Sequence, residues 1–151
     1  MSSFYTQWLS EHASLLNASS ASLHYVGSDE SLYLLASFNL PLSTQEVIQM
    51  IPKGKGIAGQ AYCTLKPYTT CNLSQDPNPL IQPQARHVQA LSAIAYPLVD
   101  EDHSPRCIGV LGFGFMHPLP SKKSSQYQDL LEQLRQFNQS LLPSMLPLKP
   151  L

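Results

Sequence analysis

Three glycines between residues 54 and 59 have the spacing of a dinucleotide-binding fingerprint. Gly54, Gly56 and Gly59 form a G-x-G-x-x-G pattern, which binds a pyrophosphate when it lies between a strand and a full helix in a βαβ unit. The segment before Gly54 is helix-like and ends at Pro52. Only about six residues follow Gly59 before Lys66-Pro67, whereas a crossover between parallel strands takes a dozen or more. The sequence therefore argues against a nucleotide site here.

We interpret these glycines as structural residues. Glycine tolerates positive φ and close packing, so the three glycines would turn the chain from one short helix into the next and let Gly59 lie against a sheet. Asp76 follows at roughly the distance of a ribose-binding acid. Without a βαβ unit, we regard that spacing as a coincidence.

Three cysteines could carry thiol chemistry: Cys63, Cys71 and Cys107. Cys71 is either a redox-active or ligand-sensing thiol or a small buried residue on a strand, as free cysteines commonly are. A disulfide between Cys63 and Cys71 would need Cα atoms within about 7 Å, which the sequence leaves open. Three cysteines do not make a disulfide framework, so we expect reduced thiols and a cytoplasmic protein.

The five histidines lack the spacing of a metal site. None belongs to H-E-x-x-H or H-x-x-x-H, and no C-x-x-C pair accompanies them. His24 alternates with Leu23 and Tyr25 on a strand-like segment, so we expect its side chain to point outward. No nucleophile elbow, acid dyad or kinase signature is present. The sequence thus predicts no catalytic residue, no metal and no cofactor.

Composition narrows the class of protein that must position these residues. Of the 151 residues, 43% are hydrophobic and 13% are charged, and the formal net charge is −1. The longest basic run is Lys122-Lys123, which argues against binding to nucleic acid or an anionic membrane. No apolar run approaches the roughly 20 residues of a membrane span, and the first residues lack the features of a signal peptide.

Hydrophobic periodicity predicts an α+β fold with an antiparallel sheet. We expect one domain over residues 1–143 and a Pro-rich, mobile tail over 144–151. Ser43 or Thr44 is expected to cap a short helix, and Leu32, Leu34 and Ala36 are expected to share one face of a strand. Expected helices are 4–16, 42–52, 56–65 and 124–142, expected strands are 20–27, 31–41, 66–73, 93–102 and 106–115, and a loop at 74–84 leads into a helical turn at 85–92.

The order and spacing of several motifs resemble a GAF domain, above all the short, free-standing bacterial GAF proteins. The matching stretches are "IPKGKGIAGQAYCTLKPYTTCNLSQDP" and "SAIAYPLVDEDHSPRCIGVLGFGF", followed by an amphipathic terminal helix. The resemblance covers about residues 4–142. It implies a PAS-like sheet of about five or six strands with the N- and C-terminal helices on one face. On the other face, the short helices and the loop would roof a pocket.

The resemblance also gives candidate pocket residues: Cys71, Asn72, Asp76, Arg86, Tyr96, Phe113 and Tyr62. Arg86 is suited to a carboxylate or phosphate, or it is a solvated loop residue. The three aromatics would line the pocket wall or fill the core. Gly109, in a glycine-containing strand, is expected to mark the close approach of a backbone or ligand.

The resemblance implies a non-catalytic module that senses an unidentified small molecule and dimerises through its terminal helices. One alternative is an enzyme resembling the free methionine-R-sulfoxide reductases of this family, although "QALSAIAYP" lacks a cysteine that those enzymes carry there. Another alternative is a ligandless module that binds a protein partner. The Cys-His pair of pigment-binding members and the residue set of cyclic-nucleotide-binding members are absent from the sequence.

Overall fold

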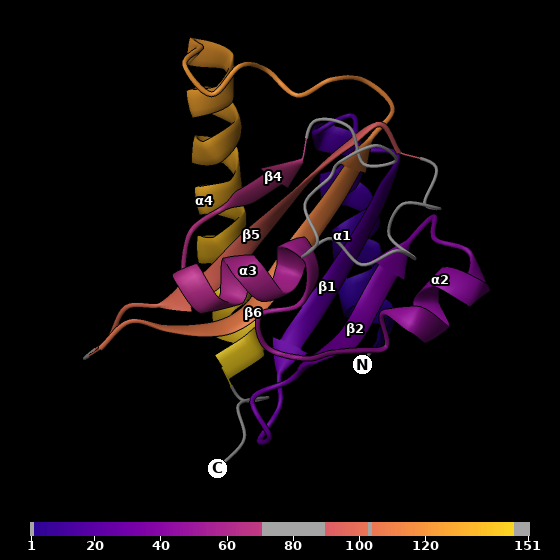
Figure 1. The fold of residues 1–151 in the computed structure, drawn as a ribbon, viewed down its shortest axis with the longest axis vertical. Coiled ribbons are helices and arrows are strands. Elements are labelled where there is room, and N and C mark those ends of the chain that lie inside the picture. The colour runs from indigo at the N-terminus through magenta and orange to yellow at the C-terminus, as the bar shows by residue number, and fades with distance from the viewer. Residues whose placement is uncertain (1, 71–89, 103, 147–151) are drawn as a thin grey trace.

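The computed structural model describes residues 2–70, 90–102 and 104–146. These residues alternate between helices and strands along the chain (Figure 1). In chain order the elements are α1 (Ser2–Leu15), β1 (Ser20–Val26), β2 (Leu32–Phe38), α2 (Leu42–Val47), β3 (Met50–Ile51), α3 (Gly56–Thr64), β4 (Tyr68–Thr70), β5 (Ser92–Asp100), β6 (Arg106–Phe115) and α4 (Ser125–Met145).

The strands form one six-stranded sheet in the order β3-β2-β1-β6-β5-β4. Every neighbouring pair is antiparallel. The hairpins β1–β2 and β5–β6 meet where β1 pairs with β6, so two strands far apart in sequence form the centre of the sheet. The predicted α+β class and antiparallel sheet are confirmed.

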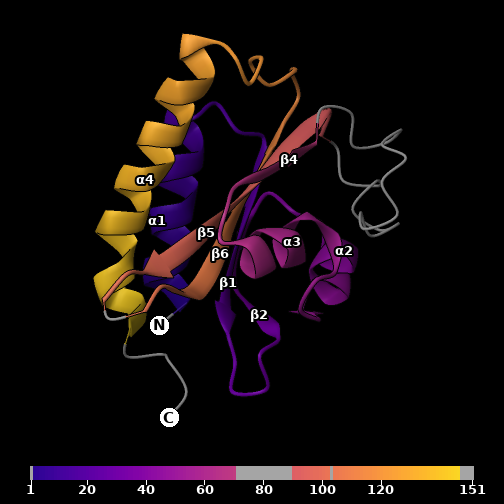
Figure 2. The same cartoon turned by 60° about the vertical axis from the view of Figure 1, so that its left-hand side comes forward.

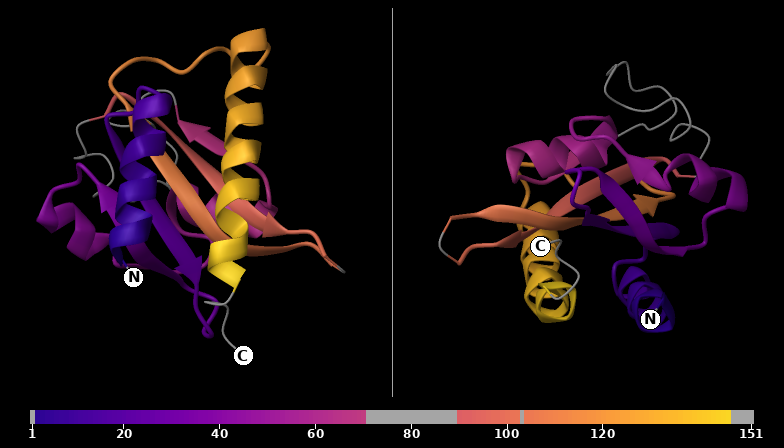
Figure 3. Two further views of the ribbon diagram at one scale, coloured as in Figure 1. Left: turned by 180° about the vertical axis from the view of Figure 1, so that it is seen from behind. Right: turned by 90° about the horizontal axis from the view of Figure 1, so that it is seen from below.

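The helices lie in two layers on opposite faces of the sheet. α1 and α4 run side by side along one face, and α2 and α3 cover the other (Figures 2 and 3). The larger hydrophobic core lies between the sheet and the terminal helices, where Leu9, Leu23, Leu111, Phe137 and Leu141 are buried. A smaller cluster lies beneath α3. Within the described residues, no helix is both long and apolar enough to cross a bilayer.

Helix α4 extends beyond its predicted end. Ser124 caps it, because its Oγ accepts a hydrogen bond from the Tyr127 backbone N–H at 3.2 Å. The helix continues through Pro143 to Met145, although proline removes a helical hydrogen bond. Met145 is fully buried in the larger core. Packing at that position outweighs the local cost of the proline, so the part of the predicted tail that is described belongs to the helix.

The segment from β2 to β3 differs from the sequence prediction in three ways. Leu32 belongs to the cluster under α3, whereas Ala36 belongs to the core under α1 and α4. A register shift in the β1–β2 pairing lies between these two residues of β2, so they face opposite sides of the sheet. The N-cap of α2 is Pro41 and not Ser43 or Thr44, and no side chain caps this helix. Thr44 is a buried residue within α2. The end of the predicted helix 42–52 instead forms the short edge strand β3.

The glycines before α3 have the structural role that the sequence predicts. Gly54 and Gly56 have φ of +85° and +64°, a region that favours glycine. The contact of Gly59 differs from the prediction. A Cβ at Gly59 would lie 2.8 Å from the backbone carbon of Gly54, so Gly59 packs on the preceding turn rather than on the sheet.

Candidate ligand-binding pocket

Small side chains cover the middle of the sheet on the face below α2 and α3. In one cross-strand row Ser20 pairs with Gly114, which pairs with Ala93. In the next row Ser22 pairs with Gly112, which pairs with Ala95. Residues two apart on a strand point to the same face, so β1, β6 and β5 together present six small residues to α2 and α3.

The opposite face of the same strands carries large side chains. Leu23, Ile94, Leu98, Leu111 and Phe113 are at most 1% exposed and belong to the core under the terminal helices. The three strands therefore fill one interface and leave the other underfilled. A helix packed over serine, glycine and alanine cannot close the space that larger side chains would occupy.

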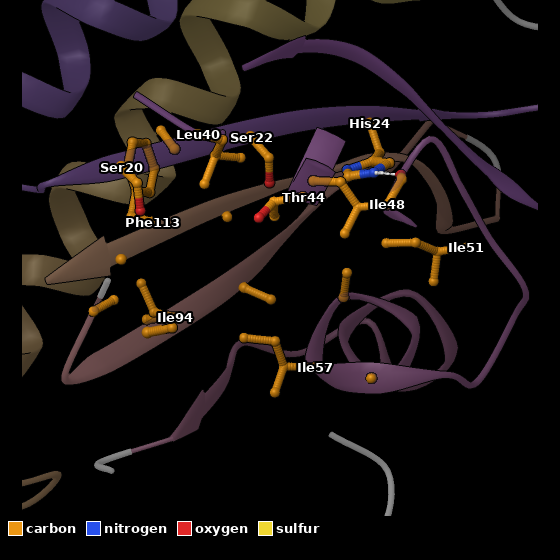
Figure 4. Close-up of a pocket in the computed structure, with 18 of the residues that line it drawn as sticks. Ser20, Ser22, His24, Leu40, Thr44, Ile48, Ile51, Ile57, Ile94 and Phe113 are labelled. Atoms are coloured by element: carbon orange, nitrogen blue, oxygen red, sulfur yellow. Dashed lines mark hydrogen bonds between the residues drawn. The ribbon is translucent and has the colours of Figure 1, made fainter. Parts of the chain in front are cut away.

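The space between the small-residue floor and the two short helices is a cavity of about 130 Å³. Figure 4 shows the side chains of β1 on one side of it and Ile57 of α3 on the other. Ile48, the C-cap of α2, and Ile51 of β3 also line it. The described lining residues are Ser20, Ala21, Ser22, His24, Leu40, Thr44, Ile48, Ile51, Lys55, Gly56, Ile57, Ala58, Ala90, Ala93, Ile94, Ala95, Gly112, Phe113 and Gly114.

A few polar groups converge on this apolar space. Ser20, Ser22 and His24 follow one another at every second position of β1, and Thr44 faces them from α2 (Figure 4). Lys55 is the charged residue among the described lining. A mostly apolar cavity with a few placed polar groups is the usual character of a small-molecule site.

His24 is the most buried polar group of the cavity, with 1% of its surface exposed. Its Nε2 lies 2.8 Å from the Ile48 carbonyl oxygen. Because a carbonyl only accepts, Nε2 carries the proton in this bond and Nδ1 of the neutral ring does not. Burial lowers the pKa of His24 from 6.5 to about 4, although the bond to Ile48 acts in the opposite direction. His24 is therefore a neutral imidazole near physiological pH.

The first turn of α3 also faces the cavity. Gly56, Ile57 and Ala58 line it, and Lys55 is the N-cap. The N–H groups of a first helical turn have no partner within their own helix. The turn through Gly54 and Gly56 thus brings backbone N–H donors to the cavity wall, beside the lining residue Lys55. This set can hold a polar group of a ligand whose body lies over the small residues.

The three aromatics that the sequence offers as pocket residues lie in different places relative to this cavity. Phe113 is among the described lining residues, although its side chain belongs to the core under the terminal helices. Tyr62 lies instead in the cluster under α3, with the Lys53 ammonium 5.0 Å from its ring centroid. Tyr96 packs against the core on the face of the terminal helices, and burial raises its pKa. Neither tyrosine is among the described lining residues.

Gly109 lies at a close approach, as its strand predicts. A Cβ there would lie 2.3 Å from the His24 carbonyl oxygen and 2.8 Å from Met145 Cε. The approaching groups are thus the neighbouring strand and α4.

Other predicted site residues lie outside the described part of the chain: Cys71, Asn72, Asp76 and Arg86. Their roles remain predictions. The two described cysteines are free thiols, of which Cys63 is exposed and Cys107 buried. Burial raises the pKa of Cys107 to about 12, and its S–H donates to the Gly109 carbonyl at 3.0 Å. Cys107 is therefore a protonated, unreactive thiol at neutral pH.

The prediction that His24 points outward is wrong, and Ser20, Ser22 and Thr44 were not recognised as cavity residues. Alternating polar residues on a strand normally mark its solvent face. Here α2 and α3 cover that face, so the alternation distinguishes the cavity side from the core side. The available signal was the roofed pocket that the family resemblance implies, combined with the small residues on neighbouring strands. Among the described residues, no three His, Cys, Asp or Glu side chains come together as a metal site.

Solved structures with the same architecture include several proteins of different activity. The chain is similar to the type II free methionine-R-sulfoxide reductase of Thermoplasma acidophilum, with a TM-score of 0.66, 14% identity, and coverage of 95% of this chain and 96% of that one. It is also similar to a Staphylococcus aureus NreA protein mutated in its nitrate binding site, with a TM-score of 0.63, 18% identity, and coverage of 85% of this chain and 96% of that one. A third similar structure is the GAF domain of an Acinetobacter phosphoenolpyruvate-protein phosphotransferase, with a TM-score of 0.60, 14% identity, and coverage of 92% of this chain and 82% of that one.

At these identities the structural similarity establishes the fold alone. The curated proteins contain no match to this chain. A family model described as a GAF domain matches residues 3–136, which includes both hairpins, the short helices over the cavity and most of α4. The chain belongs to the GAF domain family.

Proposed function

We propose that this protein is a non-catalytic regulatory module that binds a small molecule in the cavity beneath α2 and α3. The observation that carries the proposal is the floor of six small residues on β1, β6 and β5. These residues leave a cavity of about 130 Å³, close to the size of an apolar cavity of about 150 Å³ that accepts benzene. The ligand is a compact molecule with a largely apolar body.

The chemistry of the described lining favours binding over catalysis. It contains no Cys, Asp or Glu, which are common nucleophiles and general bases. The base nearest to its serines and threonine in the described part is His24, whose accepting nitrogen Nδ1 forms no hydrogen bond with any of these hydroxyls. These groups can orient a ligand, but they do not form a nucleophile–base pair.

Three residues connect the cavity to the helices on the other face of the sheet. Ala21, Ile94 and Phe113 line the cavity and also belong to the core under α1 and α4. A ligand that fits one arrangement of these residues better than another shifts the balance between the two, by no more than its difference in affinity. Occupancy would then change how the terminal helices pack.

The exposed surface of the terminal helices supports a homodimer, whose interface would respond to the change in helix packing. Phe4 and Leu15 on α1 are 54% and 66% exposed. They are eleven positions apart, which is close to three turns of a helix with 3.6 residues per turn, so they share one side of α1. We infer that this side of α1 pairs with a second copy of the chain.

The two described cysteines, Cys63 and Cys107, are free thiols. Because disulfides are rare in the cytoplasm, we infer that the protein is cytoplasmic.

A thiol-dependent methionine-R-sulfoxide reductase is the second candidate, favoured by the similarity to the Thermoplasma acidophilum enzyme. Such an enzyme would need Cys71 or Cys63 as its reactive thiol, because Cys107 is buried and protonated. The test is turnover of free methionine-R-sulfoxide with dithiothreitol. We expect no turnover. Turnover that disappears in Cys71→Ser would replace the regulatory proposal with the enzymatic one.

Native mass spectrometry of the protein as purified from its producing cells tests ligand binding directly. We expect a mass above that of the chain that is lost on denaturation, which indicates a noncovalent ligand. Ser22→Leu would fill the cavity and remove this mass. Ser37→Leu is the matched control, because Ser37 pairs with Ser22 across β1 and β2 but does not line the cavity. A ligand retained by Ser22→Leu would contradict the proposed site.

A further inference from the structure

One ring nitrogen of His24 has no hydrogen-bond partner in the described structure. Nδ1 is buried and unpaired, while Nε2 donates to the Ile48 carbonyl. The imidazole lines the cavity at the end of the polar row that begins with Ser20 and Ser22 (Figure 4). Burying a polar atom without a partner costs free energy that a native structure usually recovers with a ligand or water.

The state of the ring defines what can satisfy Nδ1. Because the bond to Ile48 places the proton on Nε2, Nδ1 presents a lone pair and can only accept. Burial keeps the ring uncharged at neutral pH by lowering its pKa. A carboxylate or phosphate oxygen would face this lone pair with its own and be repelled. A neutral hydroxyl or N–H group would pair with it.

We propose that the ligand of this cavity is an uncharged molecule whose hydroxyl or N–H group donates a hydrogen bond to Nδ1 of His24. This inference rests on the proposed ligand-binding function. The rest of the ligand contacts the isoleucines and alanines of the lining, so a compact alcohol, phenol or azole matches the site. An ammonium group is disfavoured, because the charged residue of the described lining is Lys55 and no carboxylate there would compensate it.

The same hydrogen bond links occupancy to the position of α2. Ile48 is the C-cap of α2, and its carbonyl holds the helix end to β1 through His24. A donor at Nδ1 polarises the ring and strengthens the Nε2–H bond to Ile48, because hydrogen bonds in series reinforce one another. Binding would therefore tighten the attachment of α2 to the sheet.

Phenol and toluene separate the hydrogen bond from simple filling of the cavity. They differ mainly by a hydroxyl in place of a methyl group, and each would be titrated by calorimetry. His24→Gln is the informative variant, since its amide N–H can still donate to Ile48 but offers no acceptor at the position of Nδ1. His24→Asn is the counterpart of this variant. The asparagine oxygen lies near the position of Nδ1 and can accept a hydrogen bond, whereas the shorter amide N–H cannot reach the Ile48 carbonyl.

We expect His24→Gln to weaken phenol binding about 10-fold and to leave toluene binding unchanged, whereas His24→Asn keeps more of the phenol affinity. In ¹⁵N spectra of the wild-type imidazole, phenol should shift the Nδ1 resonance and toluene should not. If toluene binds but His24→Gln affects both probes equally or neither, the inference is wrong and the cavity proposal stands. An Nδ1 resonance that is already hydrogen-bonded and that phenol leaves unchanged also overturns it. Failure of both probes to bind the wild type overturns both proposals.

Discussion

The burial of His24 links the protonation of one side chain to the stability of the fold. Its pKa is about 4 in the folded protein against 6.5 for an exposed histidine. Between these values the unfolded chain binds a proton that the folded protein does not. The stability that neutral His24 contributes is fully present above pH 6.5 and is lost as the pH falls toward 4. At pH 4 this loss should amount to about 3 kcal/mol.

Urea unfolding of the wild type and His24→Gln at a series of pH values measures this loss. Glutamine does not titrate, so the variant should show a shallower decrease in unfolding free energy between pH 6.5 and 4. The difference between the two proteins isolates His24 from the carboxylates that titrate in the same range. Parallel curves for the two proteins would mean that the imidazole is not buried in its neutral form.

Gly109 is the residue at which a single methyl group should be least tolerated. A Cβ there meets a backbone oxygen, that of His24, at 2.3 Å, and a backbone cannot rotate away. We expect Gly109→Ala to lower the unfolding free energy by about 3 kcal/mol. Gly112→Ala is the comparison, because its Cβ would meet only the Ser22 hydroxyl, and it should cost about 1 kcal/mol or less. Equal losses would contradict the close strand approach.

At the scale of elements, the end of α4 is the point where packing overrides a local signal. Pro143 favours a helix end, yet the helix continues and buries Met145. Met145→Ala should therefore lower the unfolding free energy by about 2–5 kcal/mol, as for other buried methionines. Met116→Ala, at a residue that is 62% exposed, should be nearly neutral. Two neutral variants would place Met145 in a mobile tail.

The elements that the sequence predicted well are those with a strong periodic pattern. Helix α4 shows apolar residues at helical spacing from Tyr127 onward, and the β1–β2 and β5–β6 hairpins show turn residues between strands. The errors lie where a nonlocal contact decides. β3 exists only through its pairing with β2, and the bulge that separates Leu32 from Ala36 depends on the register with β1.

The candidate site was less predictable than the fold for a physical reason. A cavity depends on residues that are small on several strands at once, and Ser20, Gly114 and Ala93 become neighbours only when β1, β6 and β5 pair. Each of these residues is ordinary within its own strand. Tyr96 illustrates the reverse case, since an aromatic on a pocket strand pointed to the other face and joined the helix-side core.

At the scale of the whole molecule, the two faces of the sheet have different roles in the proposed mechanism. α2 and α3 would contact the ligand, and α1 and α4 would contact a second copy. We expect Phe4→Ser to raise the dimer dissociation constant at least 10-fold, which corresponds to about 1.4 kcal/mol. Leu42→Ser, at a residue that is 75% exposed on α2, should not change it. Sedimentation equilibrium distinguishes these outcomes. Dissociation by Leu42→Ser alone would place the dimer interface on the face of α2 and α3 and contradict the proposal.

Methyl NMR with toluene tests most directly whether the cavity beneath α2 and α3 binds a small molecule. In protein with labelled isoleucine and leucine methyl groups, toluene should shift the resonances of Ile48, Ile51 and Ile57, which line the cavity. The methyl groups of the exposed Leu15 on α1 should not move, and Ser22→Leu should abolish the shifts. Shifts confined to Leu15, or shifts of the three isoleucines that persist in Ser22→Leu, would contradict the account.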